Sequence, residues 1–126
     1  MPRQKDKSLS CRSRFRVMAG SLIALGPGKV DLLEAIEKAG SISQAARSMK
    51  LSYRRAWDMV ETMNLSFKKP LVKSVTGGSK GGGAQLTDSG KKMVELFRSM
   101  EKQAEIAVSE DWKKIRKALK APIKTK

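Results

Sequence analysis

The 126-residue chain contains no histidine and a single cysteine, Cys11, and these two shortages limit the chemistry that it can perform. Histidine is the most frequent general acid or base in enzymes, so catalysis of that kind is disfavoured. One cysteine cannot close an internal disulfide, and zinc sites normally use several cysteine or histidine ligands. The composition therefore predicts a protein that is not an enzyme, holds no metal or cofactor, and works in a reducing compartment, the cytoplasm.

Acidic residues and long apolar runs are also scarce. Twelve Asp and Glu face 27 Lys and Arg, which gives a net charge of +15. Such an excess repels itself unless a polyanion is near, and nucleic acid is the first candidate, ahead of an anionic membrane. No apolar stretch approaches the roughly 18 residues of a membrane-spanning helix, and glycine and serine interrupt the one run that faintly resembles a signal peptide. We predict a DNA partner and no membrane.

The chain is expected to form one domain between two basic segments. Residues 1–13 are polar and without periodicity, which predicts a disordered tail. One folded domain is expected over 14–110, and a basic amphipathic segment over 111–126. Two apolar runs separated by Ala19-Gly20 predict a β-hairpin at the start of the domain.

Three helices are predicted in the first half of the domain, after a break at Pro27-Gly28. Apolar residues recur at helical spacing, with Gly40 placed as a C-terminal cap and Ser43 and Ser52 as N-terminal caps. Two short helices joined by a turn and preceded by a third are the helix-turn-helix pattern. The three helices are expected over residues 29–40, 43–49 and 52–67.

The second helix of a helix-turn-helix presents its N-terminal residues to base edges in the major groove. Here those residues are Ser52, Tyr53, Arg54 and Arg55. Arginine binds guanine through two hydrogen bonds, but adjacent residues point about 100° apart on a helix. One arginine is therefore expected to read a base and the other to pair with phosphate, with Asp58 orienting Arg54 one turn away.

Other polar residues are predicted phosphate ligands at the start of the preceding helix. Ser41, Ser43 and Gln44 lie where free backbone N–H groups attract anions. Trp57, although close by, is predicted to belong to the core.

The segment TGGSKGGGAQLT is the richest in glycine. Strands predicted over 70–75 and 84–87 flank it, so it reads as the wing that follows a helix-turn-helix. Glycine lets the backbone approach phosphate closely, and a lysine supplies charge. A functionless hairpin tip is the alternative, and a nucleotide loop is disfavoured because the G-x-x-x-x-G-K-[ST] pattern is absent. The predicted DNA contacts of the wing are Thr76, Gly77, Gly78, Ser79, Lys80 and Gly81.

A long helix is expected over 88–109, capped by Thr87. Its apolar residues repeat in steps of four and three, which is a short heptad seam. We predict a homodimer through this seam, and packing on the chain's own domain is the alternative. The seam residues are Met93, Phe97, Met100, Ala104 and Ala107.

The C-terminal stretch, SEDWKKIRKALKAPIKTK, predicts an amphipathic helix capped by Ser109. Trp112, Ile115 and Leu119 share one face, and lysine and arginine cover the rest. A docking helix and an arm that binds phosphate or a membrane surface are equally compatible with this pattern.

Three motifs in this order, GSIS-x-AA, SY-x-x-AWD and TGG-x-x-GGG-x-x-LT-x-x-G, resemble the N-terminal DNA-binding domain of the ModE family of molybdate-responsive regulators. The resemblance covers about residues 15–107. It implies a dimeric winged helix that binds a palindromic operator, with residues 43, 44 and 52–55 facing DNA and 77–83 as the wing. Full-length members carry a C-terminal molybdate-binding module. Because only about twenty residues follow the long helix, we expect a DNA-binding domain that does not itself sense molybdate.

The predicted fold is therefore mainly α with small β: a winged helix-turn-helix with an N-terminal hairpin and a long C-terminal dimerisation helix. The predicted function is a transcription regulator. A non-specific architectural nucleic-acid-binding protein is the alternative, and a phosphate-binding enzyme is a distant third. A small-molecule effector is not identified by the sequence.

Overall fold

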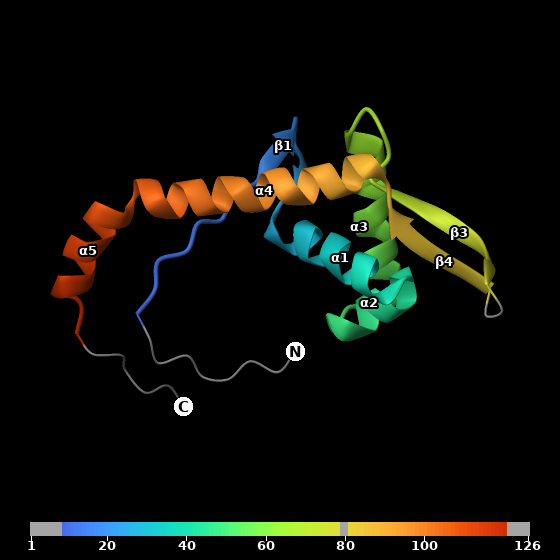
Figure 1. The fold of residues 1–126 in the computed structure, drawn as a ribbon, viewed down its shortest axis with the longest axis horizontal. Helices are drawn as coiled ribbons and strands as arrows, with labels where there is room; N and C mark the ends of the chain where they lie inside the picture. Colours follow the sequence, from blue (N-terminus) through green and yellow to red (C-terminus); the bar gives the residue numbers. More distant parts are fainter. Residues whose placement is uncertain (1–8, 79–80, 121–126) are drawn as a thin grey trace.

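The computed structural model describes residues 9–78 and 81–120 of the chain. In these residues a small hairpin precedes three helices, a second hairpin follows them, and a long helix and a short one end the described chain (Figure 1). None of the described helices is long and apolar enough to cross a bilayer. In chain order the elements are β1 Val17–Ala19, β2 Leu22–Leu25, α1 Pro27–Ala39, α2 Ile42–Ser48, α3 Tyr53–Ser66, β3 Val72–Gly78, β4 Gly81–Leu86, α4 Asp88–Ala107 and α5 Ser109–Ala118.

Helix α1 begins at Pro27, so the predicted break at Pro27-Gly28 is wrong. Proline suits the first helical position because its fixed φ matches the helix and no N–H is lost there. The predicted cap at the other end is confirmed: Gly40 adopts a left-handed φ of 81°, and its N–H donates to the Ile36 carbonyl at 2.8 Å.

Helices α2 and α3 form the helix-turn-helix. Ser41 is the cap of α2, because its Oγ accepts the Gln44 N–H at 3.1 Å. The prediction that Ser43 caps this helix is therefore wrong, and Ser43 lies in the first turn. Ser52 caps α3 as predicted, accepting the Arg55 N–H at 3.0 Å.

The core lies where α1, α2 and α3 meet the second hairpin and α4. Leu32, Leu33, Ile36 and Met63 are fully buried there, and α4 adds Phe97 to the same buried cluster. Burial of this apolar set is the main favourable contribution to folding.

The wing is the antiparallel pair β3–β4, which pairs Val72 with Leu86 at its base. Both strands extend into the glycine segment, further than predicted. Asn64 of α3 fastens the first strand, because its side-chain oxygen accepts the N–H groups of Leu71 at 2.8 Å and Val72 at 3.1 Å. Its amide also donates to the Val72 carbonyl at 3.1 Å. The wing is thus attached directly to the helix-turn-helix.

Helix α4 runs above α1, with the wing at one end and α5 at the other (Figure 1). Thr87 caps it as predicted: its Oγ1 accepts the Gly90 N–H at 3.0 Å and donates to the Pro70 carbonyl at 2.7 Å. Ser109 does not cap α5, which begins directly after Val108 without a side-chain cap bond.

An ion network joins α4 to α1. The Arg98 guanidinium lies 2.7 Å from a carboxylate oxygen of Asp31, 2.7 Å from one of Glu34 and 2.9 Å from one of Glu101. Hydrogen bonds to Glu34 raise the pKa of Arg98 above its usual range, although partial burial acts in the opposite direction. The network is one of the links between α4 and α1.

Candidate nucleic-acid interface

The N-terminal turn of α3 is exposed, as expected for a recognition helix. Tyr53 is 55% exposed, and Arg54 and Arg55 also face solvent. The Ser52 hydroxyl accepts a backbone N–H as the cap and retains its own hydrogen to donate elsewhere. The four predicted residues therefore lie together at one end of one helix.

Arg54 is held between two neighbours on α3. Its Nε lies 3.4 Å from Oδ1 of Asp58, as predicted, and its guanidinium carbon lies 5.9 Å from the centre of the Trp57 ring. Arg54 and Asp58 are both largely exposed, so the ion pair contributes little stability. Its effect is to orient an arginine that points away from the core.

Arg55 points to a different side of the helix. Burial lowers the pKa of Lys29, and the charge of Arg55 lowers it further. Lys29 donates to the Ile23 carbonyl at 2.6 Å. As adjacent residues of α3, Arg54 and Arg55 leave the helix about 100° apart. The two arginines diverge, and only Arg54 is held by Asp58 and Trp57.

The polar residues at the start of α2 lie beside α3. The hydroxyl oxygens of Ser41 and Ser43 are 3.5 Å apart, and the Gln44 side chain is exposed. Ser41 is occupied as a cap acceptor but can still donate. The three predicted phosphate ligands therefore share one surface.

A groove separates α3 from the wing. Tyr53 and Thr76 lie in its lining, together with Ser41 and Ser43. Trp57 also lines it and is 39% exposed, so its predicted place in the core is wrong. Trp57 follows Tyr53 by one helical turn, and this i, i+4 spacing could have indicated the shared exposed face.

The glycine-rich wing is described except at its tip. Gly77, Gly78 and Gly81 belong to the strands, with Gly78 opposite Gly81. Ser79 and Lys80 lie outside the described residues.

The wing also contacts the end of α1. The Ala84 N–H donates to the Gly40 carbonyl at 2.9 Å. A Cβ on Gly83 would lie 2.8 Å from the same oxygen, a distance that real Cβ atoms do not show. Glycine at position 83 therefore permits the close approach of the wing to the helix-turn-helix.

The predicted dimer seam divides into two parts. Phe97 is 1% exposed inside the chain's own core and Met93 packs against it, so Phe97 cannot also form a contact face with a second copy. The physical reason is that α4 needs its N-terminal half to cover the core. Met100 is 40% exposed, Ala104 is half-buried and Ala107 is exposed, so this half of the seam remains available.

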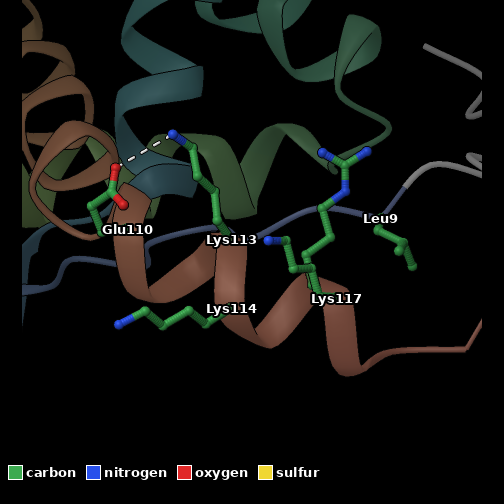
Figure 2. A pocket seen from close by; sticks show the side chains of 6 residues that line it. Leu9, Glu110, Lys113, Lys114 and Lys117 are labelled. Carbon is green, nitrogen blue, oxygen red and sulfur yellow. Dashed lines mark hydrogen bonds and ion pairs between the residues drawn. The ribbon is translucent and has the colours of Figure 1, made fainter.

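Helix α5 carries a cluster of cations away from the core. Figure 2 shows Lys113, Lys114 and Lys117 on this helix, with Lys113 3.4 Å from a carboxylate oxygen of Glu110. Leu9 of the N-terminal segment lines the same hollow. No α5 residue is buried, and Ile115 is 57% exposed.

No protein-family model matches the chain. Over 78 residues, which are 62% of its length, the chain is 50% identical to the molybdenum transport protein ModE of Azotobacter vinelandii. Over 83 residues, or 66% of its length, it is 41% identical to the transcriptional regulator ModE of Haemophilus influenzae. Over the matched residues, this chain is a homologue of the ModE proteins. It covers 29% and 32% of these two relatives, less than a third of their length.

A solved structure agrees with the fold. The DNA-binding domain of CbnR, in complex with DNA, superposes with a TM-score of 0.53 over 70% of this chain and 95% of that one. The identity is 16%, so the likeness concerns the fold alone. The predicted winged helix with an N-terminal hairpin and a long C-terminal helix is confirmed, and with it the resemblance to the ModE proteins.

Proposed function

We propose that this chain is a DNA-binding transcription regulator that reads a site in the major groove. The observation that carries the proposal is the shared surface of Tyr53 and Arg54 on α3, Ser41 and Ser43 on α2, and the wing. The ModE-like sequence and the net charge of +15 support it. Nothing in this surface requires an enzymatic activity.

Each part of the surface has a role in this proposal. The start of α3 enters the major groove, where Arg54 binds a base edge and Ser52, Tyr53 and Arg55 contact bases or phosphates. The start of α2, with Gln44, binds phosphate through hydroxyl and backbone N–H groups. The wing, including its lysine at position 80, follows the backbone or the minor groove.

We further propose a homodimer on a palindromic site. The second half of α4 exposes Met100 and Ile106, which is 66% exposed, and the first hairpin exposes Leu22, at 58%. These apolar side chains are exposed and available for contact with a second copy. The 20 residues of α4 span about 30 Å, close to the ~34 Å between half-sites one DNA turn apart. In this proposal residues 14–110 form the DNA-binding domain, and the basic segments 1–13 and 111–126 flank it.

Selection of bound duplexes from a random-sequence library tests the function. We expect one enriched, two-fold symmetric sequence, bound ~10³-fold or more tightly than random DNA. Binding should also weaken steeply as salt rises, with about one unit of slope for each neutralised phosphate. A specificity ratio near one would instead favour the architectural alternative, and no duplex binding would refute both.

Two variants test the assigned roles. Arg54→Ala is expected to cost about 1–3 kcal/mol on the selected sequence and to relax its preference at one position. Lys80→Ala should weaken binding to all sequences alike. Equal and sequence-independent losses from both variants would contradict base reading by Arg54.

A further inference from the structure

We infer that the groove between α3 and the wing holds the sugar-phosphate backbone of one DNA strand, and that Trp57 is a backbone contact in it. This inference rests on the proposed function and adds a contact that fixes the position of the protein on the duplex. Trp57 lines the groove from α3, and Thr76 lines it from β3.

The geometry of duplex DNA supports a backbone at this place. The major and minor grooves are separated by the backbone of one strand. If the start of α3 lies in the major groove and the wing reaches the adjacent minor groove, that backbone must pass between them. The space between α3 and the wing is the groove that the structure forms.

The lining of the groove suits phosphate and sugar. On the α2 side the groove presents the hydroxyls of Ser41 and Ser43, and on the wing side those of Ser74 and Thr76. All four are hydrogen-bond donors. Lys73 adds a cation on β3. Such donors account for much of the contact that proteins make with the DNA backbone.

The charges in the groove favour one of its ends for the DNA strand. Glu61 also lines it, one helical turn beyond Trp57. A carboxylate repels phosphate, so the backbone is expected beside Tyr53 and Trp57 rather than near Glu61. At this end Arg54 lies against the Trp57 ring, with its guanidinium carbon 5.9 Å from the ring centre.

Trp57 supplies two kinds of contact. The indole N–H is a donor with no acceptor function, which suits a phosphate oxygen. The ring offers an apolar face to a deoxyribose. Neither contact depends on the base, so Trp57 contributes to affinity and register but not to sequence preference.

Fluorescence and binding test the inference in the full chain. The chain has two tryptophans, so Trp112→Phe leaves Trp57 as the reporter. We expect its emission to change saturably when a random-sequence duplex of about three helical turns is added. Trp57→Phe keeps a ring but loses the N–H, and should weaken binding by about tenfold on both random and selected duplexes. Unchanged emission, unchanged affinity, or a loss confined to the selected sequence would overturn the inference.

Lys73 provides a second variant on an exposed strand position. Lys73→Gln should weaken binding to both the random and the selected duplex and lower the salt slope by about one unit. Lys102→Gln makes the same charge change on α4, outside the groove lining, and should have neither effect. Equal effects of the two lysine variants would count against the groove. If Arg54→Ala relaxes sequence preference while Trp57→Phe and Lys73→Gln leave binding intact, the proposed function survives and this inference fails. If the unaltered chain binds no duplex, the proposed function itself fails.

Discussion

Gly90, in the first turn of α4, is the position where one added methyl group should disturb the fold most clearly. It is buried, and a Cβ built on it would collide with the carbonyl oxygen of Leu71 and come within 3.0 Å of the carbonyl carbon. Both are backbone atoms, which cannot rotate away as the end of a side chain can. The same carbonyl accepts the Thr87 N–H at 2.9 Å, so moving it would also weaken the start of α4.

The expected cost of Gly90→Ala follows from three terms. Overpacking typically costs ~1–3 kcal/mol. Weakening the hydrogen bond to the Leu71 carbonyl adds about 1 kcal/mol. Alanine is the better helix former by at most about 1 kcal/mol, which offsets part of the loss. We expect a net loss of about 1–3 kcal/mol in the free energy of unfolding, and a melting temperature lower by several degrees.

Urea denaturation followed by circular dichroism measures this loss, and Gly28→Ala is the matched control. Gly28 also lies in the first turn of a helix, α1, but a Cβ there meets no atom within 4 Å. Gly28→Ala should therefore leave stability unchanged or raise it by up to about 1 kcal/mol. If Gly90→Ala were as stable as Gly28→Ala, the close contact between α4 and the Leu71 carbonyl would be refuted.

Three further substitutions test how the elements are joined. Gly83→Ala should separate the wing from the Gly40 carbonyl and cost about 1–3 kcal/mol, measured by the same denaturation. It should also weaken DNA binding, because the wing is displaced. Asn64→Ala removes two hydrogen bonds to Val72, the first residue of β3, and one to Leu71, the residue before it. It should cost about 2 kcal/mol, with faster hydrogen exchange in β3 as the check. Arg98→Gln should lower the free energy of unfolding by only about 1 kcal/mol, since the carboxylate partners of Arg98 are partly exposed. In thermal melts, the difference in melting temperature from the unaltered chain should shrink at high salt.

The elements were predictable because their signals are local. Apolar spacing placed the three helices, and Ser52, Thr87 and Gly40 act as the expected caps. Errors occurred where two local interpretations compete. Ser41 and Ser43 can each cap α2, and the choice depends on which one has the extended backbone of a cap residue, as Ser41 does with φ −155° and ψ 154°.

The site was predictable as a set of polar residues but not as a shape. The exposed end of α3 follows from the helix-turn-helix pattern. The position of Trp57 does not, because a tryptophan beside buried Ala56 and Val60 reads as core until the wing is seen to leave a groove on that side. The division of the predicted dimer seam into a buried half and an exposed half has the same cause. The heptad pattern shows that one face of α4 is apolar, but it does not show that Phe97 is buried in the chain's own core.

Gly40 shows how the fold and the candidate site depend on one another. Its φ of 81° ends α1, and the next residue, Ser41, begins the capping of α2. Its carbonyl accepts the Ala84 N–H and so holds the wing. The α2 and wing sides of the groove are therefore joined through backbone atoms of adjacent residues, without a flexible side chain between them. A groove fixed in this way loses little conformational freedom when a strand enters it, which lowers the entropic cost of binding. Substitution of Gly40 by a residue that disfavours positive φ should accordingly disturb helix packing and DNA affinity together, whereas Trp57→Phe should change affinity alone.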